Sequence, residues 1–178
     1  DAPKFGETYL ISSTKKISAL SLASDMCRYD IIKLLLDNGA DVKQLEWNPL
    51  MHAVVFGTLN DVKRCLTDES LLHHKDVSKK TPFLLSVVTG DIAKAEFLLD
   101  AGSDREAKGY MHYTPFLYAV RNEDLDMISW LARNGFDIDE PGAISDTTPL
   151  VMAICIDSVT CIERLLDLGA DINKRDER

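Results

Sequence analysis

The sequence contains no long apolar segment. None of its apolar runs approaches the ~20 residues that a transmembrane helix needs, so we expect no direct membrane insertion. Its first residues, Asp1 to Lys4, lack the charged and apolar pattern of a secretory signal, and no Met precedes them. We therefore expect a piece of a longer protein. Hydrophobic residues make up 46% of the 178 residues, which excludes disorder and suits one domain with a sizeable core.

Basic residues are too few and too scattered for a nucleic-acid-binding surface. The chain has 20 Lys and Arg against 29 Asp and Glu, a net charge of −9, and no basic run exceeds a pair such as Lys79-Lys80. Because an acidic chain repels phosphate backbones, we expect no nucleic-acid partner. The same charge either attracts a basic protein or peptide or serves solubility alone.

The four cysteines form no CxxC pair, and no Asn-x-Ser/Thr acceptor with an allowed middle residue occurs. All four lie in segments whose pattern predicts helices, namely at Cys27, Cys65, Cys155 and Cys161. Free and mostly buried thiols fit a reducing compartment better than a disulfide framework. We therefore expect an intracellular protein of the cytoplasm or nucleus.

The sequence also lacks the motifs of catalysis and of cofactor binding. It has no Gly-x-Ser-x-Gly elbow and no glycine loop that could hold a phosphate. His73 and His74 are adjacent rather than spaced to face one ion, and His112 lies about a repeat away. We expect no catalytic residue, no metal site and no cofactor, and hence no enzyme.

Four prolines at a constant spacing are the main positive feature of the sequence. Pro49, Pro82, Pro115 and Pro149 are separated by 33, 33 and 34 residues, and such a period is typical of stacked-repeat proteins. Thr precedes three of them and Asn precedes the first, so each proline is expected at the first position of a capped helix.

A second helix is predicted after each of these short apolar helices. Its apolar residues recur at helical spacing, as in Ile92, Ala95 and Leu98, and it ends at a glycine 20 residues after the proline, as at Gly102. Neither helix is long enough to be stable alone in water. Each pair must therefore bury its apolar face against neighbouring pairs, which predicts an all-α stack.

These units resemble ankyrin repeats. The Thr-Pro-Leu-His-x-Ala signature of that family is matched by Thr148-Pro-Leu-Val-Met-Ala153 and by equivalent stretches at the other prolines. Its Leu-Leu-x-x-Gly-Ala-Asp close appears at residues 35–41 and 165–171. The resemblance covers roughly residues 17–178. It implies an all-α ankyrin-repeat solenoid of helix-turn-helix units joined by short β-hairpin-like fingers.

The repeat pattern predicts a single domain of five units. Gly39 implies a unit upstream of the first proline, with Ala19 in the proline position. The units then cover approximately residues 17–46, 47–79, 80–112, 113–146 and 147–178, and residues 1–16 form an N-terminal flank or cap.

Some positions depart from the family pattern. The connector after the first unit is short, which predicts a clipped finger. Glu69 stands where the second unit should close with Gly, so its second helix is expected to end differently or to run on. Cys27, Glu123 and Asp157 occupy the glycine position between paired helices, where we interpret them as turn variants that cost about 1 kcal/mol.

The family resemblance places a partner-binding groove on the concave face, between the fingers and the first helices of the units. By position in the repeat, the candidate partner-binding residues are Trp47, Phe56, Lys80, Tyr110, Met111, Tyr113, Tyr118 and Arg121. Aromatic residues, Met and Arg are enriched at interface centres. The alternative is that these residues pack on adjacent fingers, and Tyr118 fits the core as well as the groove.

The resemblance implies a protein–protein interaction module that acts as an adaptor, scaffold or targeting domain. We expect a protein or peptide partner and a monomeric fragment. One alternative is a regulatory or substrate-recruiting ankyrin domain of a larger enzyme or channel. A groove for a small molecule or nucleotide fits less well, because the chain is acidic and has no glycine-rich loop.

Overall fold

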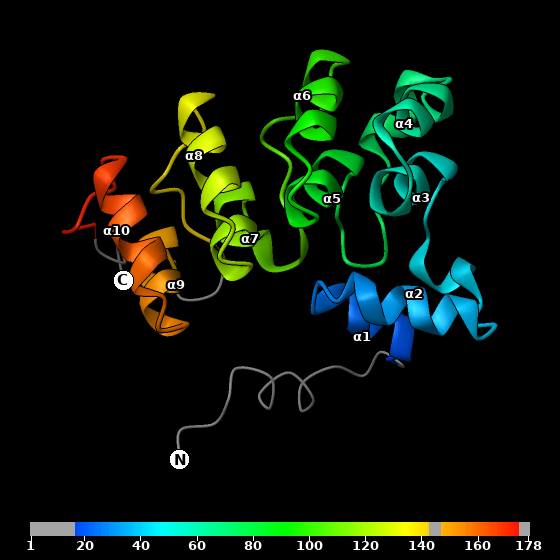
Figure 1. The fold of residues 1–178 in the computed structure, drawn as a ribbon, viewed down its shortest axis with the longest axis horizontal. Helices are drawn as coiled ribbons and strands as arrows, with labels where there is room; N and C mark the ends of the chain where they lie inside the picture. Colours follow the sequence, from blue (N-terminus) through cyan, green and yellow to red (C-terminus); the bar gives the residue numbers. More distant parts are fainter. Residues whose placement is uncertain (1–16, 143–146, 175–178) are drawn as a thin grey trace.

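The computed structural model describes residues 17–142 and 147–174. Within these residues the chain forms ten α-helices and three short 3-10 helices and no β-strand, which confirms the expected all-α class (Figure 1). The helices pair along the chain into five helix-turn-helix units. The α-helices are α1 Ala19–Asp25, α2 Tyr29–Asp37, α3 Pro49–Phe56, α4 Leu59–Cys65, α5 Pro82–Val88, α6 Ile92–Asp100, α7 Pro115–Arg121, α8 Leu125–Arg133, α9 Pro149–Cys155 and α10 Val159–Asp167, and the 3-10 helices are η2 Val42–Leu45, η3 Glu69–His73 and η4 Tyr110–His112.

The prolines begin helices as the sequence predicts. The side chain of Asn48 accepts a hydrogen bond from the backbone of Met51 at 2.8 Å. Thr81, Thr114 and Thr148 cap α5, α7 and α9 in the same way. The first helix has no proline, and a reciprocal pair of hydrogen bonds between Ser18 and Ser21 caps it instead.

The turns within the helix pairs explain the departures from the repeat pattern. Cys27, Glu123 and Asp157 have φ angles between 53° and 59°, in the left-handed region that Gly90 occupies with a φ of 73°. They are the strained turn variants that the sequence predicts. The prediction that Cys27 lies in a helix is therefore wrong, because this residue forms the turn between α1 and α2. Of the other cysteines, Cys161 is buried, Cys65 is half-buried and Cys155 is exposed.

The closing segment of the second unit differs from the others. Helix α4 ends at Cys65, and the chain then forms the separate 3-10 helix η3, which starts at Glu69. No glycine is needed there because the chain does not make the left-handed turn seen at Gly102 and Gly169. Within the described residues no helix has the length and apolar character to cross a bilayer.

Helices α3 to α10, which we call the four-pair stack, share one apolar core. The first helices of these pairs, α3, α5, α7 and α9, pack against one another in order. Met51, Leu84 and Leu117 hold equivalent positions in three of these helices, and each is at most 1% exposed because the next pair covers it. Burial of such apolar faces is the main force that holds the pairs in line.

Helices α1 and α2, which we call the first helix pair, do not continue this row. They lie below α3 and α5 in Figure 1 rather than beside them, and α1 packs against α2 and η2 instead of along α3. The pair has its own small core, built on Leu20, Ile32 and Leu45. Ala19 of α1 is equivalent to Pro49 of α3, 30 residues later in the chain. In this alignment Ser21 and Ser24 of α1 are equivalent to Met51 and Val54 of α3. Helix α1 therefore lacks the apolar side chains that the other first helices use for stacking.

The fingers before Pro82 and Pro115 are tight turns closed by a hairpin hydrogen bond. The backbone N–H of Asp76 donates to the carbonyl of Lys80 at 2.9 Å, and that of Gly109 donates to the carbonyl of Tyr113 at 3.0 Å. Neighbouring fingers are also joined, since the Tyr110 N–H donates to the Ser78 carbonyl at 2.9 Å. These bonds give the hairpin-like connections that the family resemblance implies.

Candidate partner-binding surface

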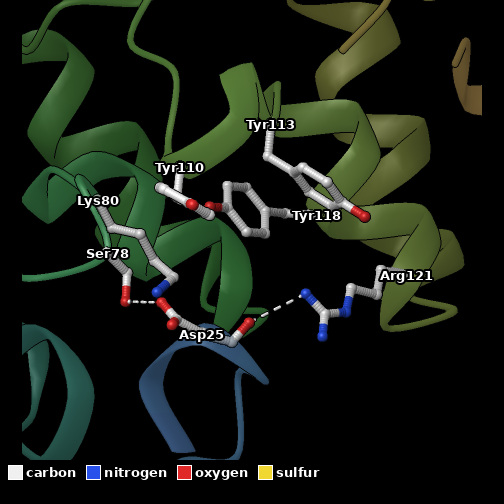
Figure 2. Close-up of a pocket in the computed structure, with 7 residues that line it drawn as sticks. All are labelled: Asp25, Ser78, Lys80, Tyr110, Tyr113, Tyr118 and Arg121. Atoms are coloured by element: carbon white, nitrogen blue, oxygen red, sulfur yellow. Dashed lines mark hydrogen bonds between the residues drawn. The ribbon is translucent and has the colours of Figure 1, made fainter. Parts of the chain in front are cut away.

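A small pocket lies where the end of α1 meets the fingers and α7. Figure 2 shows the seven side chains that line it, which come from four different units of the chain. They are Asp25, Ser78, Lys80, Tyr110, Tyr113, Tyr118 and Arg121. Five of the eight predicted partner-binding residues therefore meet at one place, although up to 41 positions separate them in the sequence.

Lys80 is a deeply buried charge of this region. Its side chain is 1% exposed, and its ammonium group donates to the Ser24 carbonyl at 2.9 Å and lies 3.2 Å from the Ser24 hydroxyl. A cation at this point is favourable because the last carbonyls of α1 carry the negative end of the helix dipole. The contact compensates part of the cost of burying the charge.

Asp76 shares the same buried site. The carboxylate accepts hydrogen bonds from the backbone N–H groups of Ser78 at 2.9 Å and Lys80 at 2.8 Å, and from the indole N–H of Trp47 at 3.3 Å. The Lys80 ammonium lies 3.9 Å from it. Burial raises the pKa of Asp76 above its usual value, and Lys80 and these hydrogen bonds offset part of the rise.

Arg121 and Ser78 hold the end of α1 from the other side. The guanidinium of Arg121 donates to the Asp25 carbonyl at 3.1 Å, and the Ser78 hydroxyl donates to the Asp25 carboxylate at 2.5 Å (Figure 2). Arg121 also lies over the ring of Tyr113, 5.9 Å from its centroid. A single side chain of α7 thus connects the first helix pair to an aromatic wall of the groove.

The tyrosines of the pocket differ in exposure. Tyr118 is 3% exposed and belongs to the core of the four-pair stack, and burial raises its pKa well above the usual value. Its hydroxyl leaves no room for a side chain at position 109, because a Cβ added to Gly109 would lie 2.0 Å from the hydroxyl oxygen. Tyr110, in contrast, is 40% exposed, and Tyr113 is half-buried. Tyr110 and Tyr113 are therefore the tyrosines that an incoming molecule could touch.

The remaining candidates lie outside the pocket. Trp47 packs with Tyr29 of α2 at a centroid distance of 6.3 Å and with Phe56 at 5.9 Å. Both Trp47 and Phe56 are half-buried beside the core of the first helix pair. Met111 is half-buried in η4 with a left-handed φ of 56°. Trp47 reaches the pocket region only through its hydrogen bond to Asp76.

Four polar residues of this site are not among the partner-binding residues predicted from the sequence: Ser24, Asp25, Asp76 and Ser78. A signal for the first was present, because Ser24 replaces the apolar residue that α3, α5 and α7 carry at the equivalent position. Asp76 and Ser78 gave no such signal, since polar residues are ordinary in a turn. Within the described residues no group of His, Cys, Asp and Glu side chains is arranged to hold a metal ion.

A family model described as ankyrin repeats in three copies matches residues 20–109, 50–142 and 108–176. These matches together span almost all of the described residues. The chain belongs to the ankyrin-repeat family. Ankyrin repeats generally serve as protein–protein interaction modules, and the family is typically non-enzymatic.

Curated relatives are similar over parts of much longer proteins. The ankyrin repeat protein nuc-2 of Neurospora crassa is 29% identical over 163 residues, which cover 89% of this chain and 15% of the relative. The transient receptor potential cation channel subfamily A member 1 homolog of Caenorhabditis elegans is 30% identical over 83% of the chain and 12% of its own length. Ankyrin repeat and SOCS box protein 6 of Mus musculus is 35% identical over 85 residues. The chain thus spans less than a fifth of the first two proteins.

Proposed function

We propose that this ankyrin-repeat domain binds a partner protein or peptide on the concave face, as an adaptor, scaffold or targeting module. The observation that carries the proposal is the convergence of Lys80, Tyr110, Tyr113, Tyr118 and Arg121 on one pocket between the fingers and α7. Tyrosine and arginine, with tryptophan, are enriched among the residues that dominate binding energy. Trp47, Phe56 and Met111 extend the proposed surface along the neighbouring fingers.

Exposure divides the proposed surface into contacting and supporting residues. Tyr110 is exposed and Tyr113 and Arg121 are half-buried, so they are proposed to touch the partner. Lys80 and Tyr118 are almost fully buried and hold the fingers and α7 in place. The net charge of −9 supports a basic partner, because it accelerates the approach of a positively charged protein or peptide.

The extent and setting of the domain are part of the same proposal. We propose one domain of five units with the boundaries that the repeat pattern predicts, acting as a monomer. Residues 1–16, the expected flank or cap, lie outside the described residues. The four cysteines are free thiols in the structure, which supports an intracellular setting in the cytoplasm or nucleus.

A peptide-display selection tests the proposal. The chain is immobilised and panned with a library of random peptides, and an enriched peptide is then titrated by calorimetry against Tyr110→Ala. We expect peptides rich in Lys and Arg, and a loss of about 10- to 100-fold in affinity for the variant, in line with an interface residue worth about 1–3 kcal/mol.

The matched control is Val159→Ala on α10, another exposed apolar side chain, away from the pocket. Its affinity should equal that of the unchanged chain. Equal affinity of the Tyr110→Ala variant, with circular dichroism showing that it is folded, would contradict the proposed surface. Failure to enrich any peptide would contradict peptide recognition by the groove.

A second candidate is that the domain regulates a larger enzyme or channel, or recruits its substrates. The lengths of the relatives favour it, since this chain matches 15% of one and 12% of another, and the latter is named as a cation channel. Deleting the region equivalent to residues 17–174 from a full-length parent protein would test this. A parent whose activity and location are unchanged by the deletion would argue against a regulatory role.

A further inference from the structure

The joint between the first helix pair and the four-pair stack contains a cluster of buried polar side chains, whereas the pairs within the stack share one continuous apolar core. We call the polar side chains of this joint the latch, and they are Ser24, Asp25, Asp76, Ser78, Lys80 and Arg121. Each of them is linked to another member by a hydrogen bond or an ion pair. Ser24, Asp76, Ser78 and Lys80 are almost fully buried.

The two regions also have separate apolar cores. Leu20, Ile32 and Leu45 form the core of the first helix pair, while the core of the four-pair stack runs from α3 to α10. Tyr29 and Trp47 pack at the boundary between the two cores. When polar side chains separate, their charges and hydroxyls form hydrogen bonds with water, which offsets part of the lost free energy. When apolar surfaces separate, their exposure to water costs free energy that no new interaction offsets.

We infer that the first helix pair is a lid, latched over one end of the concave groove, which undocks as a unit while the four-pair stack stays folded. In the docked state the end of α1 lies against Lys80 and Arg121 and accepts hydrogen bonds from both side chains. Undocking releases both side chains from α1 and exposes the adjoining face of the pocket. We also infer that undocking controls the access of a partner to this surface, and this second part rests on the proposed function.

Cys27 is a natural reporter of the docked state. It lies in the turn after α1, half-buried beside the latch, and burial raises the pKa of its thiol. Cys155 is exposed and Cys161 is buried within α10. Undocking should therefore expose Cys27 further and speed its alkylation, while alkylation of Cys161 requires opening of the stack.

The first experiment measures iodoacetamide alkylation of each cysteine in the full chain by peptide mass spectrometry. Lys80→Met removes the cation that holds α1, and Arg121→Gln removes the second contact. We expect Cys27 to react at least about tenfold faster in Lys80→Met, with a smaller rise in Arg121→Gln and no change at Cys161. Lys43→Met, an exposed lysine of η2, is the control and should leave all rates unchanged.

A parallel rise at Cys27 and Cys161 would overturn the inference, because it would show one cooperative unit. An unchanged Cys27 rate in both latch variants would overturn it as well. The Cys161 rate also reveals whether a variant has unfolded. Neither result depends on a partner, so this experiment is independent of the proposed function.

The second experiment locks the lid. The Ser24 and Ser78 hydroxyl oxygens are 3.1 Å apart, so Ser24→Cys with Ser78→Cys places two thiols within reach of a disulfide, in a chain that also carries Cys27→Ser. A peptide from the display selection should bind the oxidised chain at least about tenfold more weakly than the same chain after reduction.

Equal binding by the oxidised and reduced chains would overturn the control of access but leave peptide binding intact. If no peptide is selected at all, the proposed function fails, and the alkylation rates still decide whether the lid detaches.

Discussion

The first helix pair and the four-pair stack are built from the same helix-turn-helix unit, but they are joined to their neighbours by different chemistry. Met51 and Val54 of α3 are fully buried under the next pair, whereas Ser21 and Ser24 hold these positions in α1. With serine there, α1 docks through hydrogen bonds to Asp76, Ser78 and Lys80 instead of stacking on α3. The comparison teaches that the signature residues specify the unit, while the side chain at the position of Ser24 contributes to how the unit is attached.

The largest expected effect comes from damaging an apolar joint. Leu84→Ala leaves a cavity in the core of the four-pair stack, where Leu84 is fully buried. We expect a loss of about 2–5 kcal/mol in the free energy of unfolding, measured by urea denaturation followed by circular dichroism. Leu34→Ala on the exposed face of α2 is the control, and it should change that free energy by less than about 0.5 kcal/mol. Similar losses for both variants would contradict the difference between the two regions.

A smaller effect is expected from damaging the polar joint. Ser24→Val removes the hydroxyl that lies within hydrogen-bonding distance of Asp76, Ser78 and Lys80, and leaves these groups with fewer partners. The docked state of the first helix pair should lose about 1–3 kcal/mol, while the urea midpoint of the stack should be unchanged. Amide exchange of α1 measures the first quantity. Ser70→Val, at an exposed serine of η3, should alter neither.

The two tryptophans allow the smallest and most closely matched test. Trp47 donates its indole N–H to Asp76 at 3.3 Å in the polar joint, and Trp130 donates to Glu96 at 2.8 Å within the stack. Replacing either by Phe keeps an aromatic ring and removes about 1 kcal/mol of hydrogen bonding. Trp47→Phe should weaken only docking, seen as faster amide exchange in α1. Trp130→Phe should lower only the urea midpoint, and the reverse pattern would contradict the account.

The features that could be predicted from the sequence are those set by local interactions. The helix starts at the four prolines depend on a neighbouring Thr or Asn, and the left-handed turns at Glu123 and Asp157 depend on their place in the repeat. The grouping of Tyr110, Tyr113 and Arg121 follows from their places on either side of Pro115, in one finger and in the helix that the finger precedes. Interactions between residues close in the sequence were therefore sufficient to predict the helix pairs of the stack.

The placement of the first helix pair could not be predicted in the same way. It depends on contacts between residues far apart in the chain, such as Ser24 with Asp76 and Asp25 with Arg121. A serine at a stacking position indicates that α1 cannot stack, but it does not indicate which polar groups the serine will hydrogen-bond. The burial of Lys80 was hidden for the same reason, since lysine in a finger is ordinarily solvated.

Native-state hydrogen exchange in low concentrations of denaturant tests the central claim most directly. Our account predicts that the amides of α1 and α2 exchange together, through an opening with a lower free energy and a weaker denaturant dependence than the opening of α5 to α8. Amides of all these helices that exchange with one common free energy and one common denaturant dependence would contradict it, because the first helix pair would then be an inseparable part of the stack.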